Sequence, residues 1–123
     1  TLFYDFPSEP LPVMLIPALW SWVIENLVKN AVDAMQGKGE ITIAIERRGH
    51  AALIDITDTG RGIAPRHRRR IFNPGFTTKS RGWGLGLSLA RRIVETYHHG
   101  RITLLRSEVG IGTTFRIKIP LND

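Results

Sequence analysis

The sequence predicts an α+β two-layer sandwich, in which a mixed sheet of about five strands carries about three helices on one face. Three observations lead to this fold class. Segments with the alternating apolar pattern of strands come before, between and after segments with helical periodicity. The 123 residues are enough for one domain, 1–123, with its own core. The chain contains no cysteine, so no disulfide can substitute for that core.

Two segments have helical periodicity. The first begins at Pro17, a residue type favoured in the first turn of a helix, and extends to about Met35. Its apolar stripe consists of Leu19, Val23, Leu27, Ala31 and Ala34. The second extends from Leu85 to Tyr97, and we expect Gly100 to be the left-handed residue beyond its end. His98 and His99 are expected at that helix end as favourable cations.

Five segments have strand character. They are residues 1–6, Glu40–Glu46, Ala51–Thr57, Arg101–Ser107 and Thr113–Pro120. Prolines follow the first of them, which we therefore expect to be an edge strand. Arg47–His50 is the expected hairpin turn between the second and third.

The segment between the third strand and the second long helix is less regular. Residues Pro65–Ile71 predict one short helix. A loop of about a dozen residues follows, from Phe72 to Gly84, and loops of this length inside a compact domain are usually functional.

The net charge is +6, and much of the excess lies in residues 66–70 and 79–92. A solvated basic face would explain it, and so would a polyanionic ligand such as a nucleotide phosphate. Nucleic acid is not expected, because exposed aromatic residues do not interleave with the basic ones and no nucleic-acid module is recognisable. No apolar run reaches 18 residues, so no direct membrane insertion is expected.

Two carboxamides share one face of the first helix. Asn26 and Asn30 are four residues apart, amid apolar neighbours. Hydrogen bonds to a nearby loop would satisfy them. An amide oxygen can also hold a hard cation such as Mg²⁺, which keeps several waters and suits an adjacent phosphate.

A carboxylate follows the apolar third strand, in the turn Asp58–Ile63. An ordinary Asp-Thr-Gly turn would explain it. As an acceptor-only group, Asp58 could instead take a hydrogen bond from an exocyclic amine, while Gly60 and Gly62 let a flat ring approach the backbone.

Three glycine-containing or aromatic segments complete the pattern. Phe72–Lys79 has two aromatic residues around a Pro-Gly turn, which either pin the loop or form a lid. Gly82, Gly84 and Gly86 alternate just before a helix start, where backbone N–H groups can meet a phosphate. Gly110–Phe115 by itself is typical of a hairpin entering a strand.

Taken in order, these segments resemble the motifs of the catalytic ATP-binding domain of sensor histidine kinases. That family shares a superfamily with gyrase, the heat-shock chaperone ATPases and the mismatch-repair ATPases. The resemblance extends from about Pro12 to Pro120. Residues 26–34 are similar to its N box, 58–63 and 82–87 to its first two glycine boxes, 72–79 to its F box and 112–115 to its last box. The sequence of Asn30–Met35 resembles that of the nitrogen-regulation branch of these kinases.

The resemblance implies the Bergerat ATP-binding fold, with ATP and Mg²⁺ as ligands. Asp58 would accept from the adenine amine with Thr113 nearby, Asn30 would hold Mg²⁺, and Asn26 would lie one turn away. Lys79 or Arg81 would contact the γ-phosphate. The implied catalytic residues are Asn26, Asn30 and Lys79. The implied nucleotide contacts also include Asp33, Gly60, Gly62, Ile63, Phe72, Thr77, Thr78, Gly82, Gly84, Leu85, Gly86 and Leu87.

Two positions depart from the family pattern. Asp33 stands where a basic or tyrosine residue is common, which weakens its case as a phosphate contact. Gly75 replaces a common second aromatic of the F box.

Asn26 distinguishes this chain from the ATPase relatives of the superfamily. It stands where those relatives have a Glu that can act as a general base, so we expect slow intrinsic hydrolysis.

The resemblance also implies partners. The γ-phosphate would go to a histidine on a separate helical dimerisation domain, and from there to a response regulator. In the family an acidic residue follows the acceptor histidine, and none follows His50, His67, His98 or His99. We therefore expect that this chain does not phosphorylate itself. We also expect it to be a monomeric cytoplasmic fragment of a longer protein, whether or not its parent is anchored in a membrane. A nucleotide-binding regulatory module and an ATPase without phosphotransfer are the alternatives.

Overall fold

A computed structural model describes residues 1–74 and 86–122 of the chain. Five strands form one mixed sheet in the order β1-β2-β3-β5-β4. The strands are β1 (Leu2–Asp5), β2 (Ile41–Arg48), β3 (Ala51–Asp58), β4 (Arg101–Glu108) and β5 (Gly112–Pro120). β1 pairs with β2 in parallel, and the remaining pairs are antiparallel. The prediction of a mixed five-stranded sheet with an edge strand at the N-terminus is confirmed.

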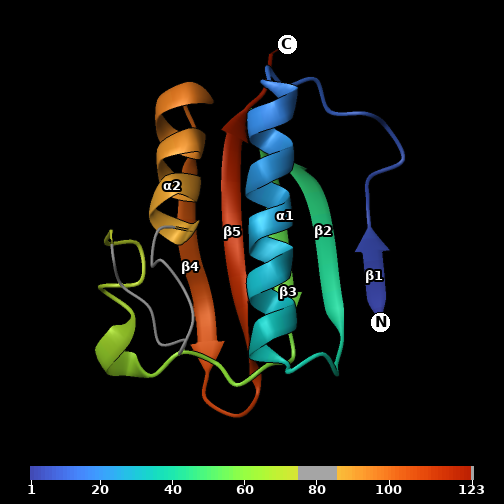
Figure 1. Cartoon of the computed structure of the whole chain (residues 1–123). Helices are drawn as coiled ribbons and strands as arrows, with labels where there is room; N and C mark the ends of the chain where they lie inside the picture. Colours follow the sequence, from blue (N-terminus) through green and yellow to red (C-terminus); the bar gives the residue numbers. More distant parts are fainter. Residues whose placement is uncertain (75–85, 123) are drawn as a thin grey trace.

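Helices α1 (Pro17–Ala34) and α2 (Gly86–Arg92) lie side by side on one face of this sheet (Figure 1). Their apolar sides meet the helix-facing residues of the strands, and this layer is the core. Its most deeply buried members include Val23, Leu27, Val94, Ile117 and Ile119. The two-layer α+β architecture is therefore as predicted.

Several element boundaries differ from the sequence prediction. β2 continues to Arg48, so the hairpin turn contains only Gly49 and His50. The short helix expected over 65–71 is a single 3₁₀ turn, Pro65–His67, followed by further turns. The second long helix ends in one wide π turn over Ile93–Tyr97, where the expected helix would have continued regularly.

The end of this π turn also differs from the prediction. His99, with φ of 56°, is the left-handed residue, whereas Gly100 is not. His98 is buried, and its ring joins two segments: Nε2 accepts from the Ile16 N–H at 3.0 Å, and Nδ1 lies 2.9 Å from the Ile93 carbonyl. Since Nε2 accepts, Nδ1 carries the proton and the ring is neutral. The expectation of a helix-end cation at His98 is therefore wrong, because the buried ring connects the start of α1 to the π turn through hydrogen bonds.

No helix in the described part of the chain is long and apolar enough to cross a membrane.

Candidate nucleotide site

Asp58 is the last residue of β3 and its side chain is buried, with 7% of the residue exposed. Its Oδ1 accepts the Gly60 N–H at 2.8 Å. Burial raises the pKa of this carboxyl above its ordinary value of 3.8, while hydrogen bonds from the backbone N–H groups of Gly60 and Thr113 oppose that rise. The result is a rigidly held acceptor that has lost much of its hydration.

The turn after Asp58 is packed against two neighbouring segments. A Cβ on Gly60 would lie 2.8 Å from atoms of Ala34, at the end of α1. A Cβ on Gly62, whose φ is +76°, would lie 2.3 Å from the Glu108 carbonyl oxygen. Close approach of the chain to itself is thus sufficient to require both glycines. Their contact with a ligand ring stays a prediction.

Backbone hydrogen bonds fasten the same turn at both sides. The Arg61 N–H donates to the Ala34 carbonyl at 3.0 Å, and the Gly110 N–H donates to the Arg61 carbonyl at 2.9 Å. Asn30 lies one helical turn before Ala34. The end of α1 thus brings the Asp58 turn and the carboxamide face of α1 into one region.

Thr113, the residue paired directly with Asp58 across β3 and β5, is buried and bonded to Ser107. The Ser107 and Thr113 hydroxyl oxygens are 2.8 Å apart, and Ser107 Oγ also accepts the Ile63 N–H at 2.8 Å. Arg68 donates to the Ser107 carbonyl and, at 3.4 Å, to the Ile63 carbonyl. Sequence reasoning missed Ser107 and Arg68.

An irregularity in β4 explains why regular strand alternation does not place Ser107 on the helix-facing side. The register between β4 and β5 shifts between Leu104 and Arg106, so that Leu105 is an extra residue. Strict alternation from Ile102 and Leu104 would turn residue 107 away from the helices. The bulge instead pairs Ser107 with Thr113 on the helix-facing side.

On α1, Asn26 lies against the start of α2. A Cβ on Gly86 would be 2.8 Å from Asn26 Oδ1 and 3.0 Å from Nδ2. Asn26 Nδ2 is buried and has no hydrogen-bond partner among the residues that the structure describes. A buried amide that lacks a partner is costly unless a ligand supplies one, so this atom fits a polar group such as a phosphate oxygen.

The other predicted contacts fall into three groups. Asn30 and Asp33 already interact with other groups of the chain, and Asp33 is exposed. Leu87 is half-buried against the core. The predicted contacts outside the described residues are Thr77, Thr78, Lys79, Arg81, Gly82, Gly84 and Leu85.

Phe72 closes the side of the core near α2. Its ring meets Phe115 edge-on at a centroid distance of 6.1 Å, and the Arg91 guanidinium lies 5.8 Å from its centroid. Phe72 therefore links β5 to α2 and is itself half-buried.

Within the described residues no group of three His, Cys, Asp or Glu side chains could form a metal centre. The Mg²⁺ expected from the sequence would therefore depend on amide and phosphate oxygens and on water, which is a ligand set that Mg²⁺ accepts. The unpartnered Asn26 Nδ2 is a hydrogen-bond donor, so it fits a phosphate oxygen, and a phosphate ligand would bring its own Mg²⁺ beside Asn30.

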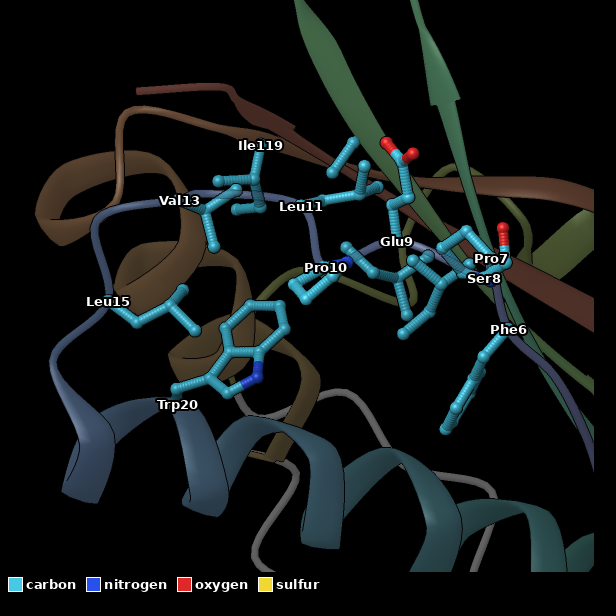
Figure 2. Close-up of a pocket in the computed structure, with 13 residues that line it drawn as sticks. Phe6, Pro7, Ser8, Glu9, Pro10, Leu11, Val13, Leu15, Trp20 and Ile119 are labelled. Atoms are coloured by element: carbon cyan, nitrogen blue, oxygen red, sulfur yellow. The ribbon is translucent and has the colours of Figure 1, made fainter. Parts of the chain in front are cut away.

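A separate pocket of about 350 Å³ lies between residues 6–15, the first turns of α1 and the sheet. Figure 2 shows Trp20 at one side of it, with Leu11, Val13 and Ile119 along another. Its lining is mostly apolar and includes none of the predicted nucleotide contacts. The pocket is therefore distinct from the region around Asp58.

Comparison with known proteins agrees with this fold. A family model described as histidine kinase-, DNA gyrase B- and HSP90-like ATPase matches residues 17–123. The sensor histidine kinase ZraS of Escherichia coli K12 is 40% identical over 116 residues, which are 94% of this chain and 24% of ZraS. The chain thus spans about a quarter of that curated relative.

Two solved structures extend the comparison. The catalytic domain of histidine kinase ThkA is 34% identical, with a TM-score of 0.85 over 97% of this chain and 77% of that one. Full-length ShkA in complex with AMPPNP is 27% identical, with a TM-score of 0.81 over 98% of this chain and 26% of that one. The chain belongs to the histidine kinase-, DNA gyrase B- and HSP90-like ATPase family. Within that family it is a catalytic domain of the sensor histidine kinase type.

Proposed function

We propose that this chain binds ATP with Mg²⁺ and donates the γ-phosphoryl group to a histidine on a separate helical domain of a two-component sensor kinase. The observation that carries the proposal is the buried carboxylate of Asp58, held by two backbone N–H groups at the end of β3. Family membership supports ATP as the nucleotide. The ShkA structure, which contains the ATP analogue AMPPNP, supports the same choice.

At the purine end, Asp58 would accept a hydrogen bond from the adenine N6 amine. Gly60, Gly62 and Ile63 form the fastened turn beside it, and Thr113 is its cross-strand neighbour. Because the carboxylate is already oriented and partly dehydrated, binding an amine costs little further desolvation. Guanine presents a carbonyl at the same position, and a carboxylate repels it.

At the phosphate end, the Asn26 amide would donate to a phosphate oxygen and Asn30 would supply an oxygen to Mg²⁺. Bound Mg²⁺ supplies charge neutralisation for the triphosphate. Gly86 and Leu87 remain predicted backbone contacts, as do Thr77, Thr78, Lys79, Arg81, Gly82, Gly84 and Leu85, with Phe72 supporting this side. Asn26 cannot accept a proton, so the chain lacks a general base at this position for hydrolysis.

The phosphoryl acceptor would lie outside this chain. His98 is buried between α1 and the π turn, and none of the four histidines precedes an acidic residue. The proposal therefore includes a helical domain that supplies the acceptor imidazole and then passes the group to a response regulator.

Nucleotide binding is tested by calorimetric titration of the chain with AMPPNP, with and without Mg²⁺. Asp58→Asn should lower the affinity at least about tenfold, because it removes a charge-assisted hydrogen bond. Asn30→Asp should change the Mg²⁺ dependence. Asp55→Asn, on the same strand but the opposite face, is the matched control and should bind normally. Equal AMPPNP affinity in the wild type, Asp58→Asn, Asn30→Asp and Asp55→Asn would contradict the site assignment.

Phosphotransfer is tested by adding the matching helical domain in trans with labelled ATP. The expected product is an acid-labile phosphohistidine on the helical domain and none on this chain alone. Binding without transfer would favour the regulatory module, and steady-state release of phosphate would favour the ATPase.

A further inference from the structure

The Asp58–Thr113 pair has a second layer of hydrogen bonds behind it, centred on Ser107. Thr113 stands directly opposite Asp58, so a ring edge bonded to Asp58 lies within reach of the Thr113 hydroxyl. Adenine presents a donor, the N6 amine, beside an acceptor, N1. Asp58 can only accept. A full match to adenine therefore requires Thr113 to donate.

The direction of the Thr113 hydroxyl depends on Ser107, because the two oxygens share one hydrogen bond of 2.8 Å. If Ser107 donates, the Thr113 proton is free to point at a ligand. If Thr113 donates, Ser107 must send its own proton to the Gly112 carbonyl, which is 3.4 Å away. That distance exceeds the usual range for O–H···O bonds, so the first arrangement is favoured.

Ser107 is held in position for this task. The Ile63 N–H occupies one of its lone pairs at 2.8 Å, and Arg68 holds its carbonyl from the turn after Ile63. The β4 bulge at Leu105 is what turns the side chain toward Thr113. Ser107 is 5% exposed, so water does not compete freely for these bonds.

We propose that Ser107 is a specificity-determining positioning residue: it donates its proton to Thr113 and thereby aims the Thr113 hydroxyl at purine N1. This inference rests on the proposed function, since it requires a purine at Asp58. It concerns the direction of the hydrogen bonds in the site. It holds whether Thr113 reaches N1 directly or through one bridging water.

The test compares ATP with 1-deaza-ATP, which lacks the N1 acceptor and is otherwise alike. Calorimetry on the wild-type chain should show ATP binding about three- to tenfold more tightly, the range for one neutral hydrogen bond. The isosteric Thr113→Val should bring that ratio close to one. Ser107→Ala should lower the ratio toward one, because the Thr113 hydroxyl keeps its proton but loses the bond that orients it. The double variant should not lower the ratio below that of Thr113→Val, because both changes act on one interaction.

The ratio is measured within each protein, so a general loss of affinity cancels. A purely structural Ser107 would weaken both nucleotides alike and leave the ratio intact in Ser107→Ala, and that result would overturn the inference. Ser107→Cys, with a weak S–H donor of similar size, repeats the measurement if the alanine variant unfolds. A wild-type chain that binds no ATP contradicts the proposed function itself. ATP binding that depends on Asp58, with a wild-type ratio of one, contradicts only the role of Ser107.

Discussion

Gly86 lies so close to the Asn26 carboxamide that a Cβ at position 86 would be 2.8 Å from Asn26 Oδ1. The first residue of α2 thus lies against the α1 side chain whose Nδ2 is buried without a partner among the described residues. This contact answers part of why a glycine stands at a helix start, where it weakens the helix. A larger residue would push aside the amide that we assign to a phosphate.

Gly86→Ala should therefore separate binding from stability. We expect ATP affinity to fall about three- to tenfold as the Asn26 amide is displaced, roughly the loss of one hydrogen bond. The free energy of unfolding should stay level or rise by up to about 1 kcal/mol, since alanine favours the helix. Calorimetry and thermal unfolding of the nucleotide-free chain measure the two quantities.

The control is the same substitution in an Asn26→Ala background. There Gly86→Ala should have no further effect on ATP affinity, because the displaced group is gone. Full additivity of the two changes would show that Gly86 acts on the nucleotide by another route.

The raised pKa of Asp58 should make both the free energy of unfolding and the ATP affinity depend on pH. Burial raises its pKa in the folded chain above 3.8, so the folded state holds the proton more tightly than the unfolded state. The contribution of this group to the free energy of unfolding therefore falls as the pH rises from 3.8 through the raised pKa, and is constant above it. The proposed contact with adenine needs the ionised form, so ATP affinity should fall as the pH is lowered through the same window.

The measurement is ATP affinity against pH for the wild type and for Asp58→Asn. The titration of the nucleotide phosphates is common to both and cancels in their difference. That difference should shrink as the pH drops, beginning above the range of an ordinary aspartate. A difference that stays constant down to about pH 4 would contradict the assignment.

The sequence predicted those features that depend on local pattern. β3 has a near-continuous apolar run that ends at Asp58, and the helix-facing alternation in β2 and β5 is visible by eye. Asn26 and Asn30 were placed correctly on one face of α1, because a four-residue spacing determines this. The roles that we assign to these residues in nucleotide binding stay predictions.

The features that the sequence did not predict depend on contacts between distant segments or on irregular backbone. His98 contacts Ile16, which is 82 residues away, and Ser107 contacts Ile63, which is 44 residues away. The β4 bulge and the π turn each change which way a side chain points, and periodicity assumes that no such change occurs.

The neighbouring histidines His98 and His99 should respond in opposite ways. His98→Phe keeps a ring in the site but removes both hydrogen bonds, to Ile16 and Ile93. We expect the free energy of unfolding to fall by about 1–3 kcal/mol, the cost of buried groups left without partners. His99→Gly should be neutral or stabilising by up to about 1 kcal/mol, because glycine adopts positive φ without strain.

Urea unfolding of both variants compares these values. The pair serves as its own control, since the two residues are adjacent and chemically identical. An equal loss in both, or a larger loss in His99→Gly, would contradict the crosslinking role of His98.

Asp55 and Arg116 face each other across β3 and β5, with two contacts of 2.8 Å and side chains 21% and 23% exposed. Asp55 is three residues before Asp58, so its side chain lies on the opposite face of the sheet. A double-mutant cycle with Asp55→Asn and Arg116→Gln should give a coupling of about 1 kcal/mol that weakens in high salt. ATP affinity should be the same in the wild type, the two single variants and the double variant. A loss of affinity comparable to that of Asp58→Asn would mean that the two faces of β3 are not independent, and the assignment of the purine to the helix-facing side would then fail.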